Sequence, residues 1–183
     1  MKLYDKLDDK IRAFIEKQKV FFVATSPLSG DGHINLSPKG YDDSFVILDD
    51  LTIAWLDIGG SGIETLAHLK ENGRITIMFC AFEGPANILR LFGTGEAVQF
   101  DDPRFAGLMK LFPAYDKARS IVVVKLDRIQ DSCGWGVPFM AFEGPRDQLK
   151  RYADNPAKSQ DDWEDKWRTG NVASIDGLPG IES

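Results

Sequence analysis

The hydrophobic positions of this chain begin at helical spacing and soon change to the spacing of strands. Within residues 5–19, one helical face carries Leu7, Ile11, Phe14 and Ile15, and charged residues lie between them. This pattern predicts an amphipathic helix that packs against a sheet. From residue 20 onward, most apolar positions fall in short runs rich in β-branched and aromatic residues, which are typical of strands.

Turn-forming residues, such as the acidic pair at 49–50, divide these runs into a series of strands. The predicted strands are residues 20–25, 33–37, 45–48, 51–56, 74–80, 88–100 and 120–127. Two helices are predicted between them, at residues 63–71 and at residues 103–112, where Pro103 suits a first turn. So many short strands with so few helices favour an antiparallel barrel or sandwich over repeated βαβ units.

The last part of the chain has a different composition. From Arg146 onward it is polar and charged, and Trp163 and Trp167 stand four residues apart, on what would be one helical face. We expect both indoles to pack against the body of the protein. The chain is therefore predicted to be a single domain, 1–183, whose residues 146–183 form a polar helical extension that is either a lid over a site or a wrap around a dimer.

A pentapeptide, Ala-Phe-Glu-Gly-Pro, occurs at residues 81–85 and again at residues 141–145. Nothing similar flanks either copy. We therefore interpret it as a local strand-to-turn motif that occurs twice, not as a domain repeat.

Composition and charge narrow the function classes. A chain of 183 residues that is 43% hydrophobic and 27% charged fits one globular domain. Its net charge of −6 argues against nucleic acid or an anionic membrane surface as a partner, so a small-molecule substrate is preferred. No apolar run approaches the roughly 20 residues that cross a bilayer. The two cysteines, Cys80 and Cys133, and the lack of a leader predict a cytoplasmic protein with reduced thiols.

Motifs that would indicate catalysis by the protein alone are missing from the sequence. His33 and His68 are far apart and neither has the spacing of a metal ligand, so no metal site is predicted. The sequence has no Ser-His-Asp order with a nucleophile elbow, no P-loop and no Gly-x-Gly-x-x-Gly after a strand. Chemistry is therefore expected to come from a bound cofactor.

The most informative segment is the glycine-rich turn at residues 57–62, which leaves a strand and opens a helix. Glycines let backbone amides approach a ligand closely, and a helix start attracts an anion. Ser61 and Thr65 add hydroxyl donors. The alternative is structural, because Ser61 and Glu64 also have the spacing of a capping box, which would satisfy the helix start by itself.

Three further features have a functional and a structural interpretation. Residues 35–40, Asn-Leu-Ser-Pro-Lys-Gly, end a strand with a hydroxyl and a cation that suit a phosphate or a polar ring edge, or they form an ordinary turn. Arg74 and Arg90 lie in or beside strands, where each needs an acidic partner or a ligand. Trp135 stands between glycines in residues 133–138 and forms either a wall for a flat ligand or a packed turn.

Taken in order, these segments resemble the pyridoxamine 5′-phosphate oxidase-like proteins, a split-barrel family that binds flavin mononucleotide (FMN). The likeness covers about residues 10–130. Its matching pieces are residues 35–40, Gly59-Gly60-Ser61-Gly62 with Glu64-Thr65, Leu69-x-x-Asn72-x-Arg74 running into residues 75–79, and residues 88–95.

The resemblance implies a mainly β fold, a six-stranded antiparallel Greek-key split barrel with α-helices, and a homodimer with the flavin at the interface. It makes Ser61 and Thr65 candidate phosphate ligands and Lys39 and Arg90 nearby cations. Ser37 and the amides that follow it would face the isoalloxazine edge. The expected cofactor-binding residues are Ser37, Pro38, Lys39, Gly40, Ser61, Gly62, Thr65, Arg74, Arg90 and Trp135.

The function implied is that of an FMN-dependent oxidoreductase of unknown substrate, with no protein general acid required. The oxidase that names the family ends in Arg-Leu-x-Pro, whereas this chain ends with residues 178–183, Leu-Pro-Gly-Ile-Glu-Ser, so oxidation of pyridoxamine phosphate is not expected. Two alternatives stay open. One is a flavin-binding module that stores or senses the cofactor without turnover, and the other is a deazaflavin- or haem-binding relative on the same barrel.

Overall fold

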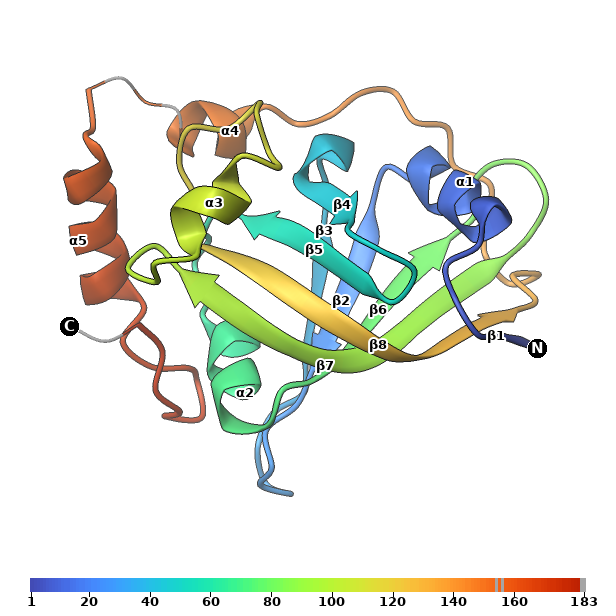
Figure 1. The fold of residues 1–183 in the computed structure, drawn as a ribbon, viewed down its shortest axis with the longest axis horizontal. Helices are drawn as coiled ribbons and strands as arrows, with labels where there is room; N and C mark the ends of the chain where they lie inside the picture. The colour runs from blue at the N-terminus through green and yellow to red at the C-terminus, as the bar shows by residue number, and fades with distance from the viewer. Residues whose placement is uncertain (154, 156, 182–183) are drawn as a thin grey trace.

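The computed structural model of the protein describes residues 1–153, 155 and 157–181, so Glu182 and Ser183 of the chain ending lie outside the described residues. One curled sheet forms the body, and helices lie around it (Figure 1). The elements are β1 (Lys2–Tyr4), α1 (Asp9–Lys17), β2 (Phe21–Thr25), β3 (Asn35–Lys39), a 3-10 turn η1 (Asp42–Ser44), β4 (Phe45–Ile47), β5 (Thr52–Asp57), α2 (Glu64–Asn72), β6 (Arg74–Cys80), β7 (Ile88–Gln99), α3 (Phe105–Met109), β8 (Ser120–Ser132), α4 (Gln148–Ala153) and α5 (Gln160–Gly170).

The sheet runs in the order β3-β2-β6-β7-β8-β5-β4, and β1 pairs with the far end of β8. Each described strand pair is antiparallel. The fold is therefore mainly β, with an antiparallel sheet curled into a half-barrel, and the predicted fold class is confirmed. The sheet has eight strands. The seven predicted strands are all present, and β1 is added because the N-terminus pairs with residues of β8 more than 120 positions away.

A bulge helps the two longest strands to bend. The register of β7 against β8 shifts between Phe92 and Gly93. A Cβ at Gly93 would lie only 2.1 Å from the carbonyl oxygen of Lys125, so the strands approach here closely enough to require glycine. Bulges of this kind increase local twist and bend the strand, which contributes to the curl.

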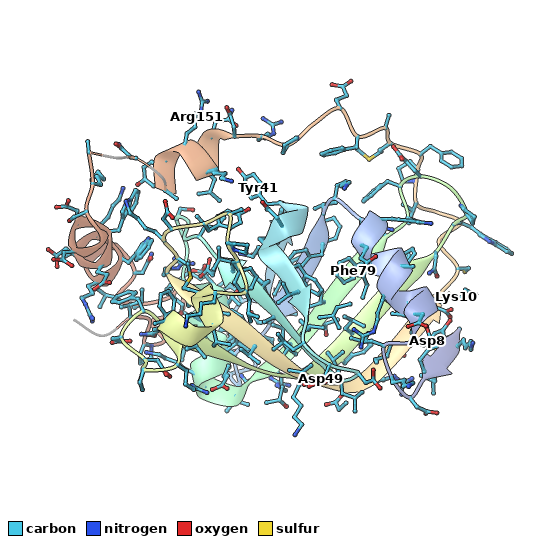
Figure 2. The ribbon with its side chains drawn as sticks, turned by 45° about the horizontal axis from the view of Figure 1, so that its top comes forward. Asp8, Lys10, Tyr41, Asp49, Phe79 and Arg151 are labelled. Atoms are coloured by element: carbon cyan, nitrogen blue, oxygen red, sulfur yellow. The ribbon has the colours of Figure 1, made fainter. Side chains whose placement is uncertain are left out.

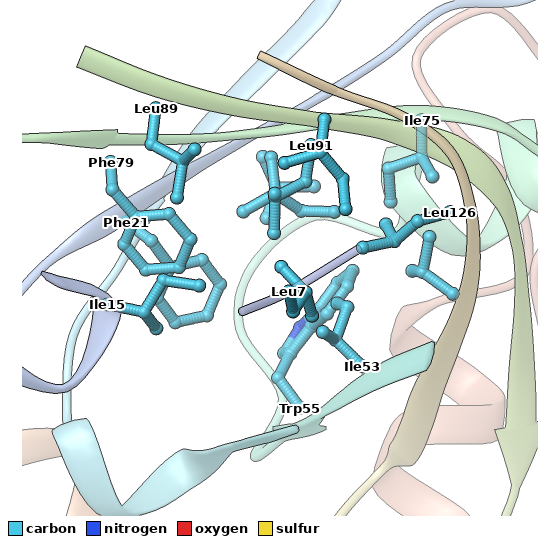
Figure 3. Close-up of a cluster of buried hydrophobic side chains, with 14 of the residues drawn as sticks. Leu7, Ile15, Phe21, Ile53, Trp55, Ile75, Phe79, Leu89, Leu91 and Leu126 are labelled. Carbon is cyan, nitrogen blue, oxygen red and sulfur yellow. The ribbon is translucent and has the colours of Figure 1, made fainter. Parts of the chain in front are cut away.

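The core fills the concave side of the sheet, and α1 closes one end of it (Figure 3). Leu7, Ile11 and Ile15 are all buried, as the helical spacing predicts. The ring of Phe21 lies 5.1 Å from that of Phe45 and 6.0 Å from that of Trp55, both in edge-on geometry. The apolar face of α1 therefore packs on the sheet as predicted.

Element boundaries differ from the sequence prediction where capping or long-range pairing decides them. Asp8 begins α1 by accepting a hydrogen bond from the amide of Ile11 at 2.9 Å (Figure 2). The last residues of β8 pair with β1 and with the start of β7. The prediction that Pro103 lies in the first turn of a helix is wrong, because α3 begins after its N-cap Arg104. Among the described residues, no helix is both long and apolar enough to cross a bilayer.

The C-terminal extension packs against its own chain. Ser159 and Asp162 form a capping box at the start of α5. Trp163 and Trp167 on this helix are 2% and 5% exposed and form a cluster with α2 and the end of the described chain, as predicted. Gly59 has a φ of +97°, and a Cβ there would lie 2.8 Å from Nε1 of Trp167. The extension therefore rests on the glycine-rich turn.

The two copies of the pentapeptide lie next to each other. The amide of Met140 donates to the carbonyl of Phe82 at 3.0 Å, and the amide of Phe142 donates to Oε1 of Glu83 at 3.2 Å. The first copy leaves β6 as a strand-to-turn segment, but the second lies in an irregular segment. The strand-to-turn interpretation therefore holds only for the first copy.

Candidate ligand-binding pocket

A cavity of about 260 Å³, here called the polar pocket, lies where the curled sheet brings β3 across from β5 and the start of β8. The glycine-rich turn and the first turn of α2 complete its wall. Its lining residues are Asn35, Ser37, Lys39, Trp55, Asp57, Gly59, Gly60, Ser61, Gly62, Glu64, Thr65, Leu66, Arg119, Ser120 and Val122. Most of these carry a polar side chain or are glycines, so the pocket suits a hydrophilic ligand.

Strand β3 contributes alternate residues to the pocket. Asn35, Ser37 and Lys39 are half-buried and line it, whereas Leu36 and Pro38 are exposed on the other face of the strand. This alternation follows from the period of two in a strand. Strand β3 is at the edge of the sheet, where the missing amide hydrogen of Pro38 is tolerated.

The hydroxyl of Ser61, in the glycine-rich turn, does not cap helix α2. Helix α2 begins at Glu64 with Ile63 as its N-cap, and no side chain caps it. The alternative capping box of Ser61 and Glu64 is therefore wrong. The physical reason is that Nη1 of Arg119 donates to the carbonyl of Gly62 at 2.9 Å, which holds the turn outside the helix.

The buried ion pair of Arg119 and Asp57 packs against this turn. Nε of Arg119 donates to Oδ2 of Asp57 at 2.9 Å, and its Nη1 donates to Oδ1 of Asn171 at 2.7 Å. Burial alone would raise the pKa of Asp57, but the charges of Arg119 and Lys39 outweigh it and lower that pKa below its usual value. Asp57 is therefore an ionised partner of Arg119, and Arg119 ties the C-terminal extension to the pocket wall through Asn171.

A chain of polar contacts runs from the pocket into the core. Oγ of Ser37 donates to Oδ1 of Asn35 at 3.0 Å, and Nδ2 of Asn35 donates to Oγ1 of Thr65 at 2.9 Å and to Oγ1 of Thr25 at 3.3 Å. Thr25 in turn lies 3.0 Å from Nδ1 of His68, which is fully buried. Burial lowers the pKa of His68, which favours the neutral imidazole.

The structure brings together five of the predicted cofactor-binding residues. Ser37, Lys39, Ser61, Gly62 and Thr65 all line the polar pocket, although they come from segments more than twenty residues apart.

The other predicted residues lie elsewhere in the chain. Pro38 faces away from the pocket, and Gly40 lines a separate cavity between α1 and β4. Arg74 donates to the carbonyl of Pro27 at 3.1 Å, outside the pocket. Arg90 lies on the opposite side of β7 from the core and donates to Ser132 at 2.9 Å. Trp135 is 88% exposed in the segment after β8.

Arg119 and Asn35 are among the pocket residues that the sequence did not predict. In the sequence, Arg119 comes just before a strand, as many surface arginines do. The strand register pairs Asp57 with Ser120, and this pairing brings Arg119 to the buried carboxylate of Asp57. Asn35 belongs to the predicted segment 35–40, but nothing local indicates that its amide reaches Thr65. The helical spacing of Thr65 and His68, three residues apart, was the available sign that one face of α2 is polar.

Comparison with known proteins relates this pocket to one family. Residues 7–133 match the sequence profile of the family described as pyridoxamine 5′-phosphate oxidase. Over 197 aligned residues, the chain is 36% identical to the pyridoxamine 5′-phosphate oxidase family protein ustO of Aspergillus flavus. This alignment covers 98% of the present chain and 78% of the fungal protein.

Solved structures share the fold. HupZ of Group A Streptococcus superposes with a TM-score of 0.55 at 22% identity, covering 68% of this chain and 92% of that chain. A Lactobacillus delbrueckii protein described as a candidate pyridoxamine 5′-phosphate oxidase superposes with a TM-score of 0.52 at 17% identity, covering 71% of this chain and 99% of that chain. At these identities the similarity establishes the fold alone.

Proposed function

Since the chain belongs to the pyridoxamine 5′-phosphate oxidase family, we propose that it binds FMN at the polar pocket and acts as an FMN-dependent oxidoreductase on a small-molecule substrate. The observation that carries the proposal is the meeting of β3 and the start of α2, which gathers hydroxyls, a cation and glycine amides in one cavity. Such a donor set is suited to a phosphate.

The residues present fit the phosphate end of this cofactor. Ser61 and Thr65 offer hydroxyls, Lys39 offers a positive charge, and the irregular turn at Gly60 has open space beside it. The indole of Trp55 also lines the pocket, and its buried Nε1 finds no hydrogen-bond partner among the described residues. A buried donor without a partner is costly, so a ligand that accepts from it would be stabilised there.

The size of the pocket bears on the assembly. A volume of about 260 Å³ is below the range of roughly 300–1,000 Å³ usual for whole ligands. We therefore place the phosphate and ribityl chain in the pocket and the ring beyond it, against a second copy of the chain. The exposed aromatic side chains of Trp135 and Phe139 suit such an interface, so a homodimer with the flavin at the interface is part of the proposal.

When bound, FMN supplies the redox chemistry, because its ring accepts and gives a hydride. The protein's own residues bind and orient it: Thr65, Ser61 and Lys39 at the phosphate, Ser37 at the adjoining polar group. The Asp57–Arg119 pair holds the glycine turn in place. His68 is buried away from solvent and Asp57 is ionised and paired, so neither is proposed as a catalytic acid.

A haem-binding function is less well supported. Nδ1 of His33 lies 2.7 Å from Oδ1 of Asp176 in a surface hydrogen bond, and His68 is hydrogen-bonded to Thr25 inside the protein. Neither histidine lines the polar pocket. The cytoplasmic location expected from the sequence stays a prediction that belongs to this proposal, since free thiols such as Cys80 and Cys133 suit that compartment.

The first experiment is an absorption spectrum of the freshly purified protein, followed by heat release and mass measurement of the chromophore. Oxidised-flavin bands and the mass of FMN are expected. A colourless protein that takes up no added FMN would refute the proposal, and the mass of a deazaflavin or haem would redirect it. Photoreduction and addition of candidate acceptors then separate an oxidoreductase from a storage module, which reacts only slowly with oxygen.

A further inference from the structure

We propose that Asn35 is a positioning residue that sets the direction of two hydroxyl groups in the polar pocket. Through Asn35, Thr65 is left to donate its hydrogen to an anionic oxygen of the ligand, and Ser37 is left to accept from a ligand hydroxyl or N–H. The inference rests on the proposed role of the pocket in binding a phosphate.

The protein uses both N–H donors of the Asn35 carboxamide. A carboxamide has two N–H donors and a carbonyl acceptor. Its Nδ2 donates to Thr65 at 2.9 Å and to Thr25 at 3.3 Å, and its Oδ1 accepts from Ser37 at 3.0 Å. Asn35 therefore has no donor left for a ligand and acts through its neighbours.

The direction of these bonds decides what Thr65 can do. A threonine hydroxyl carries one hydrogen and two acceptor lone pairs. Because the hydroxyl oxygen of Thr65 accepts from Asn35, its own hydrogen is available. Within residues 1–153, 155 and 157–181, this hydroxyl donates to no acceptor. Ser37 is in the opposite state, since its hydrogen goes to Asn35 and its lone pairs remain for the ligand.

The core holds the amide in this orientation. Its second N–H points to Thr25, which is only 3% exposed and is itself bonded to the buried His68. The strand register places Asn35 directly opposite Thr25, so the contact follows from backbone pairing. Rotation of the amide by 180° would reverse donor and acceptor at Thr25, Thr65 and Ser37 together, so the directions of the three hydrogen bonds are linked.

The arrangement selects a class of ligand. Thr65, Ser61 and Lys39 present donors and a positive charge, whereas Ser37 presents an acceptor nearby. A phosphate ester of a polyol matches this pattern, because its phosphate accepts hydrogen bonds and its neighbouring hydroxyl donates one. The ribityl phosphate of FMN belongs to this class.

A double-mutant cycle tests whether Asn35 acts through Thr65. Dissociation constants for FMN, riboflavin and inorganic phosphate are measured for the wild type, Asn35→Ala, Thr65→Val and the double variant. Each single substitution is expected to weaken FMN and phosphate binding about tenfold or more, as for loss of a bond to a charged group. For inorganic phosphate, which the proposal places at Thr65 alone, the double variant is expected to bind no more weakly than Thr65→Val. Riboflavin, which lacks the phosphate but keeps the hydroxyls assigned to Ser37, is expected to bind Thr65→Val like the wild type and to lose less affinity than FMN in the two variants that lack Asn35. A general distortion of the pocket would weaken riboflavin and FMN equally.

Two further variants test the direction of the bonds. Asn35→Asp has the same shape but no N–H, so Thr65 would turn its hydrogen toward the carboxylate and phosphate binding would fall further than in Asn35→Ala. Leu36→Asp is the matched control, because it adds the same charge to β3 on the exposed face. Thr65→Ser keeps the hydroxyl and is expected to retain FMN binding. Thermal unfolding of every variant identifies any that fail to fold.

The outcomes separate this inference from the proposed function. Additive losses in the cycle, or equal losses of FMN and riboflavin, overturn the role of Asn35 while FMN binding by the wild type still supports the function. Wild-type protein that binds phosphate with the coupled pattern but not FMN supports the inference and refutes the function. Wild-type protein that binds neither FMN nor phosphate refutes both.

Discussion

The guanidinium Nε of Arg119 lies 2.9 Å from Oδ2 of Asp57, and the two side chains are buried in the wall of the polar pocket. Arg119 also holds the carbonyl of Gly62 and the side chain of Asn171. One residue thus joins the end of β5, the glycine-rich turn and the C-terminal extension. The stability of the fold and the shape of the pocket depend on the same contact.

Replacing Arg119 by Met is expected to lower the free energy of unfolding by about 3–5 kcal/mol, because it leaves a buried carboxylate without its partner. Urea unfolding followed by tryptophan fluorescence measures the loss. The control is Arg104→Met, whose ion pair with Glu96 is exposed and should matter by less than about 1 kcal/mol. If Arg119→Met is too unstable to purify, Asp57→Asn with Arg119→Met is expected to recover part of the loss. Equal effects at both arginines would contradict the role of the buried pair.

The same pair predicts how stability depends on pH. The pKa of Asp57 is lowered in the folded protein, so its contribution is complete above the unfolded value of 3.8 and is lost as the pH falls through the lower folded value. The difference in unfolding free energy between the wild type and Asp57→Asn should therefore be constant near neutral pH and shrink below pH 3.8. Urea midpoints between pH 2 and about 7 test this. A difference that grows on acidification would show the sign to be wrong.

Gly59→Ala is expected to destabilise the packing of the C-terminal extension. The residue has a φ of +97°, which costs alanine about 1–3 kcal/mol, and the new methyl group would meet Trp167. Gly60→Ala is the matched control, because nothing lies within 4 Å of its Cβ position. Unfolding midpoints and the fluorescence of Trp167 are the measurements, and similar midpoints for both variants would argue against the close contact.

Ser61→Ala combined with Thr65→Ala is expected to weaken FMN retention, because two hydroxyl donors to a phosphate are lost at about 1.5–3 kcal/mol each. Since α2 has no side-chain cap, the Ser61 change should leave thermal stability nearly unaltered. Thr94→Ala, at an exposed position of β7, serves as the control. Unchanged affinity in a flavin titration would rule out these two residues as phosphate ligands.

Trp135→Ala tests the proposed dimer. Its side chain is 88% exposed in the protomer, so the substitution should not alter the stability of the isolated chain. It is expected to weaken dimerisation and FMN binding together, as measured by analytical ultracentrifugation and flavin titration. Leu28→Ala, at a 64% exposed position, should affect neither. Loss of FMN binding without any change in the dimer would place Trp135 at the ligand but not at an interface.

Local sequence signals predicted the elements well where neighbours along the chain decide them. Strand β6 has the predicted bounds, and Trp163 and Trp167 share a buried helical face as expected. The bounds of elements were predicted less well where contacts with residues distant in the sequence determine them. The far end of β8 depends on pairing with β1, and the start of α2 depends on Arg119.

The sequence by itself determined the alternation of apolar residues, the turns between strands and the candidate hydroxyls Ser61 and Thr65, because these depend on residues a few positions apart. Only the tertiary structure decided which candidates meet. The curl of the sheet brings Ser37 and Lys39 to Thr65 and leaves Arg74, Arg90 and Trp135 elsewhere in the chain, since strand register and sheet curvature are set by contacts between residues distant in sequence.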